Sequence, residues 1–167
     1  METGQHPAPA RLRALPSWLL GQAAVAAHRL TDHALAGAGL RRHHFAMLCA
    51  LEEFGPSSQT DLGRCTSIDR SDVAAAINAL ADGGHIDRTP DPTDGRRNII
   101  TITPAGTALL DRLGILLDQA QDELLHSWTP TERNDLTAQL ARILDAKPTS
   151  TSTPPARGTG KADSSFS

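Results

Sequence analysis

Most of this chain shows one periodicity, and a single short segment departs from it. Apolar residues recur at every third or fourth position in several stretches, which is the spacing of one buried helix face. Between residues 85 and 103 the pattern changes to two short runs rich in β-branched residues, joined by the turn-forming sequence PDPTDGRR. The sequence therefore predicts a mainly α-helical fold that contains one small β-hairpin.

The composition also favours helices. Aromatic residues make up 3% of the 167 residues and tyrosine is absent, so the core must be built from Leu, Ile, Val and Ala. With 39% hydrophobic and 21% charged residues, the chain has the composition of one ordinary globular domain. These values argue against a large β-sandwich.

Both ends of the chain are expected to be disordered. Residues 1–14 contain few apolar residues, and residues 148–167 are dominated by Ser, Thr, Pro and Gly, so neither end can offset the entropy cost of ordering. The first residues lack the apolar core of a secretory signal, and no stretch approaches the roughly 18 apolar residues of a membrane span. We therefore expect one folded domain over residues 15–147, a cytoplasmic location and no membrane partner.

Local signals mark where the first two helices and the fourth begin and end. The first helix follows Pro16 and ends at the glycines of residues 37–39, and the second runs over about 41–54. The fourth begins at Asp69, whose side chain can cap its first turn, and ends at Gly83. These boundaries leave a short third helix between the second and the fourth.

The remaining helix starts carry N-terminal capping signatures. In the third helix, within SSQTDLGRC, Ser58 and Asp61 form a Ser-x-x-Asp signature. Thr103 and Pro104 supply an N-cap and a first-turn proline for the fifth helix, and the sequence of residues 129–132 combines a capping box with such a proline for the sixth. Two short helices, a turn and a hairpin with a basic loop are the parts of a winged helix-turn-helix.

The run LGRCTSIDRSDVAAAINALADGGHIDRTPDPTDGRRNIITITPAG resembles the helix-turn-helix and wing of the MarR family of bacterial transcriptional regulators. Its most specific part is the Asp-Gly-Arg of residues 94–96 followed by the Ile-Thr-Pro-Ala-Gly of residues 102–106, a wing-to-helix join typical of that family. A helix fits the major groove of DNA, while a loop with an arginine reaches the narrower minor groove.

The resemblance implies a sequence-specific DNA-binding regulator, not an enzyme, that acts as a homodimer on a palindromic operator. Its partners would be double-stranded DNA and a second copy of the chain. Residues 41–103 would form the winged helix-turn-helix, and helices in 15–39 and 104–146 would form the dimerisation region. Their long apolar faces fit this arrangement, because a small domain has little else to cover them. An intramolecular bundle is the alternative for these helices.

The resemblance also places the DNA-binding residues. Asp94 is expected to pair with Arg96 and to orient its guanidinium toward the minor groove. Asp72 either favours the positive end of its helix dipole or accepts a hydrogen bond from cytosine N4. Arg64 either favours the negative end of the third helix or reaches a phosphate. The predicted DNA-binding residues are Arg64, Arg70, Ser71, Asp72, Asn78, Asp94, Arg96 and Arg97.

One departure and one charge count bear on this prediction. Ala75 and Ala79 occupy recognition-helix positions where family members commonly carry a basic residue, so the alternative is a winged-helix interaction module with weak or lost DNA binding.

The net charge is −3, and residues 41–97 hold seven arginines against nine acidic residues. Affinity for DNA must therefore come from where the arginines lie rather than from bulk charge.

Regulators of this family often release DNA when a small, commonly anionic or aromatic molecule binds between the dimerisation helices and the winged domain. Aromatic faces and convergent polar groups form such pockets, although tryptophan is also enriched in dimer contacts. The candidate ligand-binding residues are Trp18, His28, Arg42, His43 and His44.

No cofactor, metal or catalytic site is expected. His28 with His33, and His43 with His44, lack the i, i+4 spacing that places two imidazoles on one helix face. The two cysteines show no CxxC motif and are expected to be reduced thiols, with a redox sensor as the alternative. The sequence contains no nucleophile elbow, P-loop, GxGxxG or HExxH.

Overall fold

A computed structural model describes residues 8–146 of the chain. The chain divides into two compact units, residues 1–126 and 127–167. The predicted disorder of residues 1–7 and 148–167 lies outside the described residues. Of the helices that are described, none combines the length and the apolar character needed to cross a bilayer.

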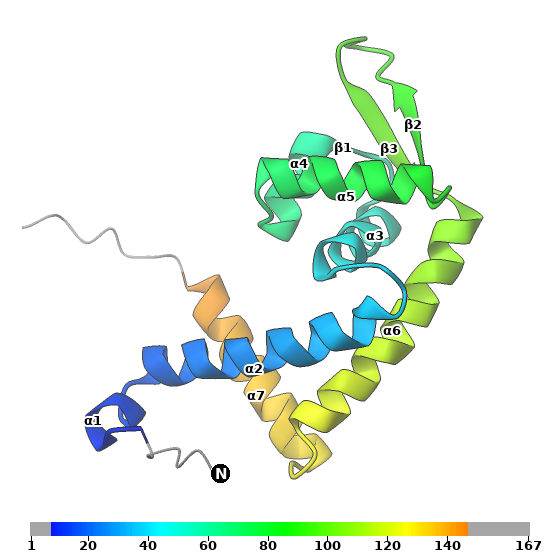
Figure 1. The fold of residues 1–167 in the computed structure, drawn as a ribbon. Helices are drawn as coiled ribbons and strands as arrows, with labels where there is room; N and C mark the ends of the chain where they lie inside the picture. Colours follow the sequence, from blue (N-terminus) through cyan, green and yellow to red (C-terminus); the bar gives the residue numbers. More distant parts are fainter. Residues whose placement is uncertain (1–7, 147–167) are drawn as a thin grey trace, which may run out of the picture. The chain divides into compact units, whose positions relative to one another are not determined.

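The first unit combines helices with a small sheet (Figure 1). Its described elements, in chain order, are α1 (Ala10–Arg13), α2 (Pro16–Ala36), α3 (Arg42–Phe54), β1 (Ser57–Ser58), α4 (Gln59–Thr66), α5 (Arg70–Asp82), β2 (Ile86–Pro90), β3 (Asn98–Ile102) and α6 (Pro104–Leu124). The second unit contains α7 (Pro130–Asp145), in which no residue is buried. The predicted mainly helical fold with a β wing is confirmed.

Two elements differ from the sequence prediction. Helix α1 falls in a segment predicted to be disordered, and the carbonyl of Pro9 closes its single turn by accepting hydrogen bonds from the backbone N–H groups of Leu12 and Arg13. Strand β1 pairs antiparallel with β3, so the sheet has the order β1-β3-β2 where a hairpin was expected. Neither element is long enough to show a periodicity in the sequence.

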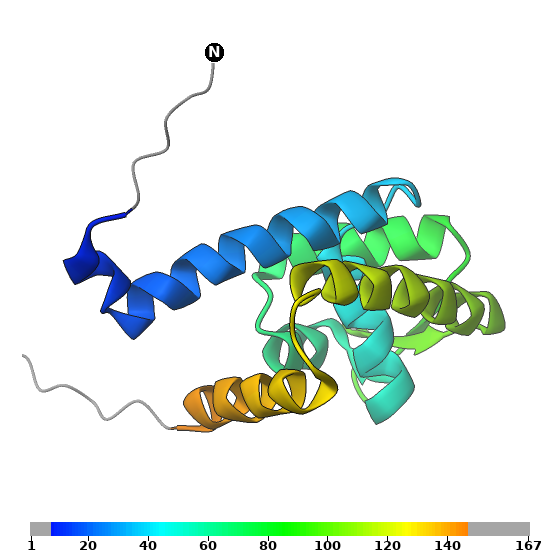
Figure 2. The same ribbon diagram turned by 90° about the horizontal axis from the view of Figure 1, so that it is seen from below.

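The core lies where α3, α5 and α6 meet β3, and it is aliphatic apart from one methionine, as the composition predicts. Helix α2 packs along α6, which Figure 2 shows from below. Leu35 is the buried residue of α2, and most of this helix is exposed in the single chain. The fully buried side chains are Leu35, Met47, Leu48, Leu51, Leu62, Val73, Leu80, Ile100 and Leu113.

Helix caps fix where the functional helices begin. As predicted, Ser58 Oγ accepts from the backbone N–H of Asp61 at 3.2 Å, and Thr103 Oγ1 accepts from that of Gly106 at 3.1 Å. The prediction for Asp69 is wrong in one respect: it occupies the N-cap position of α5, but its side chain forms no capping hydrogen bond. The Asp69 side chain is exposed, so its carboxylate does not depend on a backbone N–H of the protein as a partner.

Candidate nucleic-acid interface

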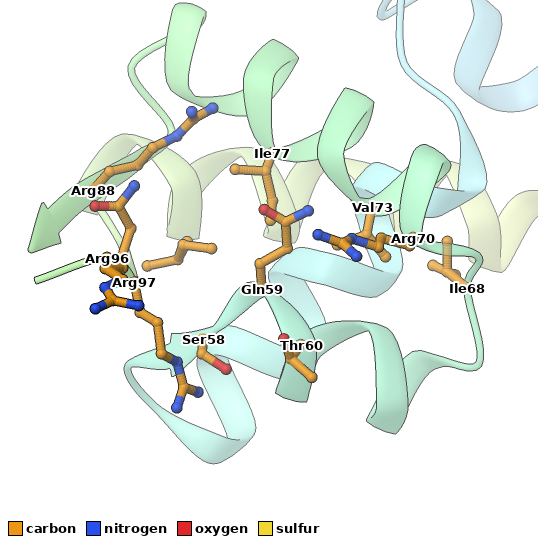
Figure 3. Close-up of a pocket in the computed structure, with 12 residues that line it drawn as sticks. Ser58, Gln59, Thr60, Ile68, Arg70, Val73, Ile77, Arg88, Arg96 and Arg97 are labelled. Carbon is orange, nitrogen blue, oxygen red and sulfur yellow. The ribbon is translucent and has the colours of Figure 1, made fainter. Parts of the chain in front are cut away.

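A groove of about 470 Å³ lies between α4, α5 and the wing, the latter being residues 86–102 (Figure 3). Four arginines line it. Figure 3 shows Arg70 of α5 at one end of the groove, and Arg88 of β2 with Arg96 and Arg97 of the wing at the other. Its apolar lining is formed by Ile68, Val73, Ile77 and Ile100.

None of the four arginines forms a close ion pair with an acidic residue among those described. Among the described residues, none of these guanidiniums has a carboxylate oxygen within 4.0 Å, whereas Arg42 and Arg64 are paired with Asp32 and Asp61. The positive charge is therefore concentrated at one groove of a chain whose net charge is −3. Such a site attracts anions in spite of the overall sign.

Two acidic residues of the wing, Asp91 and Asp94, hold the wing's own loop. Asp91 Oδ1 accepts hydrogen bonds from the backbone N–H and the hydroxyl of Thr93, at 2.8 and 2.7 Å, and these bonds hold the pKa of Asp91 below its usual value. Asp94 Oδ1 accepts from the backbone N–H of Arg96 at 3.1 Å.

This contact differs from the predicted pairing of Asp94 with the Arg96 guanidinium. An aspartate readily bonds the backbone N–H two residues further on, because this closes a tight Asx turn. Asp94 therefore fixes the backbone from which Arg96 projects and leaves the guanidinium without a carboxylate partner among the described residues.

The first turn of α5 exposes the predicted recognition residues Arg70, Ser71 and Asp72. Arg70 lines the groove, whereas Ser71 and Asp72 do not. Asp72 Oδ2 lies 3.9 Å from His43 Nδ1 of α3. The acidic side chain also sits at the positive end of the α5 dipole, which fits the structural role for Asp72; its contact with cytosine stays a prediction.

Asn78 contacts the wing. Its Oδ1 accepts a hydrogen bond of 2.7 Å from Arg88 Nη2, and this bond joins α5 to β2. Arg88 was not among the predicted DNA-binding residues, although it lines the groove. The signal that could have found it is strand alternation, since Arg88 lies two residues after the buried Ile86 and shares its face of β2.

Arg64 does not line the groove. Its Nη1 donates to Asp61 Oδ1 at 3.0 Å within α4, and Asp61 also accepts a 2.6 Å hydrogen bond from the Ser58 hydroxyl. The Ser58 bond, aided by the charges of Arg64 and Arg97, holds the pKa of the Asp61 carboxyl below its usual value. The structure thus gives Arg64 a helix-stabilising partner, and its phosphate contact stays a prediction.

The five predicted ligand-binding residues lie on α2 and α3, and their role in ligand binding stays a prediction. Arg42 Nε pairs with Asp32 of α2 at 2.8 Å, while His44 Nδ1 accepts the backbone N–H of Arg41 at 2.9 Å and so caps α3. Burial lowers the pKa of the His44 imidazole. None of the five lines the groove. His43 Nδ1 lies 3.9 Å from Asp72 Oδ2, and Trp18 and His28 lie on α2, half-buried and exposed respectively.

Metal and redox chemistry gain no support from the geometry. Within residues 8–146, no three His, Cys, Asp or Glu side chains are grouped closely enough to hold a metal ion. Both cysteines are free thiols. Burial raises the pKa of Cys49, which lowers its thiolate fraction, and Cys65 is exposed.

Comparison with known proteins agrees with this geometry. A model described as MarR family matches residues 38–97. The chain is 31% identical over 102 residues to the HTH-type transcriptional repressor NicR of Pseudomonas putida. The aligned region covers 61% of this chain and 65% of NicR, so the chain spans slightly less than two thirds of NicR. It is 30% identical over 104 residues to the uncharacterized HTH-type transcriptional regulator YxaD of Bacillus subtilis, covering 62% of this chain and 73% of YxaD.

Two solved structures share the fold at 26% identity. BpsR of Bordetella bronchiseptica, studied for regulation of its DNA binding by 6-hydroxynicotinic acid, aligns with a TM-score of 0.73 over 83% of this chain and 99% of its own. The transcriptional repressor CouR bound to a 23-mer DNA duplex aligns with a TM-score of 0.75 over 84% and 99%. The winged helix-turn-helix, the wing-to-helix join and these similarities show that the chain belongs to the MarR family of transcriptional regulators.

Proposed function

We propose that this protein is a homodimeric transcriptional regulator that binds a palindromic operator and releases it when a small ligand binds. The observation that carries the proposal is the groove between α5 and the wing, lined by four arginines that have no described carboxylate partner. In the proposed complex α5 lies in the major groove, and Arg96 enters the adjacent minor groove. Arg64, Arg70, Ser71, Asp72 and Arg97 are candidate contacts, and Asp94 holds the wing loop.

Exposed apolar side chains support the dimer. Val25 of α2 is 66% exposed, Ile115 of α6 is 60% exposed and Leu144 of α7 is 84% exposed in the single chain. All three lie in the segments 15–39 and 104–146 that the sequence assigns to dimerisation. Nine of the eleven large apolar side chains that are exposed among the described residues lie in these two segments, and a second copy would bury them in a symmetric interface.

Release by a ligand is supported by similarity. BpsR is a structural neighbour whose DNA binding is regulated by an organic acid, 6-hydroxynicotinic acid. We propose an effector of the same chemical class for this protein. The candidate residues Trp18, His28, Arg42, His43 and His44 lie on α2 and α3, and we propose that the second copy completes the effector site.

Fluorescence anisotropy with a labelled duplex from the region upstream of the protein's own gene tests this function. We expect salt-sensitive binding of two protomers per duplex, at least about tenfold tighter than to a shuffled duplex of the same composition. Sedimentation should show a dimer without DNA. Equal affinity for the two duplexes would contradict a sequence-specific regulator, and absence of all DNA binding would favour the interaction module.

A further inference from the structure

The geometry of B-DNA says what must occupy the space between a recognition helix and a wing. Neighbouring major and minor grooves are separated by one sugar-phosphate strand. A protein that places a helix in one and a wing arginine in the other must therefore hold that strand between them. In this chain the space is the groove of about 470 Å³ between α5 and the wing. The inference below rests on the proposed DNA-binding function.

We infer that Arg88 binds a DNA phosphate in this groove and that Asn78 is the residue that positions it. Arg88 Nη2 donates to Asn78 Oδ1 at 2.7 Å, and the Arg88 side chain lines the groove together with Arg70, Arg96 and Arg97 (Figure 3). A guanidinium has five N–H donors in a fixed plane, so one bond to Asn78 leaves donors for phosphate oxygens.

The identity of the partner matters. An amide oxygen orients the guanidinium but leaves its full positive charge, whereas a carboxylate would cancel that charge before DNA arrives. No described carboxylate oxygen lies within 4.0 Å of the Arg88 guanidinium. Arg88 is therefore both oriented and charged, which is the state that an anion-binding arginine requires.

The backbone of Arg88 lies in a regular strand, whereas Arg96 and Arg97 lie in the loop of the wing. It lies at the centre of β2, paired with Ile100 of β3, and its partner Asn78 lies within α5. Both ends of the contact are thus in regular elements that pack on the core. An exposed arginine loses side-chain entropy when it binds, and prior fixation by Asn78 removes part of that cost.

The same contact changes the role predicted for Asn78. An asparagine reads adenine by using its amide oxygen as acceptor and its amide nitrogen as donor at once. In this chain the amide oxygen already accepts from Arg88. This bond turns the amide oxygen toward β2, and we expect Asn78 to act through Arg88 rather than to read a base edge.

The test measures binding of the full-length protein to the upstream duplex and to a random-sequence duplex over a range of salt concentrations. The variants are Arg88→Ala, Arg88→Lys, Asn78→Ala and the double variant Arg88→Ala with Asn78→Ala. Arg11→Ala is the matched control, because Arg11 is an exposed arginine on α1 that lies outside both the groove and the segments assigned to dimerisation. Thermal unfolding of each variant checks that it is folded.

We expect Arg88→Ala to weaken binding to both duplexes by a similar factor, about fivefold or more, and to reduce the salt slope by about 1 for each protomer bound. Arg88→Lys keeps the charge and should retain most of the slope. Asn78→Ala should weaken binding less, and it should have no further effect in the Arg88→Ala background, since the two residues act as one unit.

Two results would overturn the inference: an Arg88→Ala variant with unchanged affinity and slope, or an Asn78→Ala variant that changes base preference whether or not Arg88 is present. Arg96→Ala separates this inference from the proposed function. If Arg96→Ala weakens binding while Arg88→Ala does not, the inference alone fails. If the wild-type protein binds neither duplex, the proposed function fails with it.

Discussion

Arg96→Ala is expected to weaken operator binding by at least about 1 kcal/mol for each half-site, which is about fivefold. Arg96 lines the groove from the wing loop, and its backbone is fixed by the 3.1 Å bond to Asp94. Among the described residues its guanidinium has no carboxylate partner, so no such ion pair has to be broken when the arginine binds DNA. A narrow minor groove has an enhanced negative potential, so an arginine placed there contributes more than one at an open phosphate.

The measurement is the dissociation constant for the upstream duplex at fixed salt, with Arg11→Ala as the control. The Arg11 variant should bind like the wild type, because it removes the same charge from α1, away from the groove. If Arg96→Ala and Arg11→Ala bind equally well, the wing does not contact DNA in the way proposed.

Gly106→Ala should destabilise the protein by at least about 2 kcal/mol. Gly106 lies in the first turn of α6, where a Cβ would fall well inside van der Waals distance of the His85 carbonyl oxygen and 2.8 Å from Ile102 Cγ1. The His85 carbonyl also accepts from the backbone N–H of Thr103 at 3.1 Å, so it cannot move away without breaking the wing-to-helix join. Overpacking of this kind against backbone costs more than the helix propensity of alanine gains.

Gly114→Ala is the matched control, since Gly114 lies in the same helix and a Cβ there would meet nothing within 4 Å. That substitution should stabilise the protein by up to about 1 kcal/mol, because alanine is the better helix former. Urea unfolding followed by circular dichroism measures both changes. A Gly106→Ala protein as stable as the wild type would mean that the join tolerates a side chain and does not set the position of the wing.

Local signals explain what the sequence could predict. Ser58 and Thr103 predict helix starts because a hydroxyl at the N-cap position accepts a hydrogen bond from a free backbone N–H of the first turn. Both capping bonds are present. The Asp-Gly-Arg of residues 94–96 and the glycine at 106 lie in the segment that identified the family. These caps and the wing-to-helix join involve residues only a few positions apart in the chain, so the sequence alone is enough to predict them.

The features that the sequence did not predict are of two kinds. Some are contacts between residues far apart in the chain, and one is the choice of an acceptor between two N–H donors of the same residue. The pairing of β1 with β3 and the bond from Arg88 to Asn78 depend on how elements pack, and no single element carries a sign of them. The Asp-x-Arg spacing does not say which N–H of Arg96 the carboxylate of Asp94 accepts. The pairing of two chains through α2, α6 and α7 remains a proposal.

The central claim is that a few well-placed arginines carry DNA binding in a chain whose net charge is −3. The most direct test is the dependence of the binding constant on salt, plotted as logarithms. If Arg70, Arg88, Arg96 and Arg97 of both protomers each neutralise one phosphate, the slope is about −7, and it is shallower where an arginine contacts a base instead. Phosphate contacts from Arg64 of both protomers would bring the slope to about −9. A steeper slope would require cations that the account does not include and would contradict it, as would binding that is independent of salt.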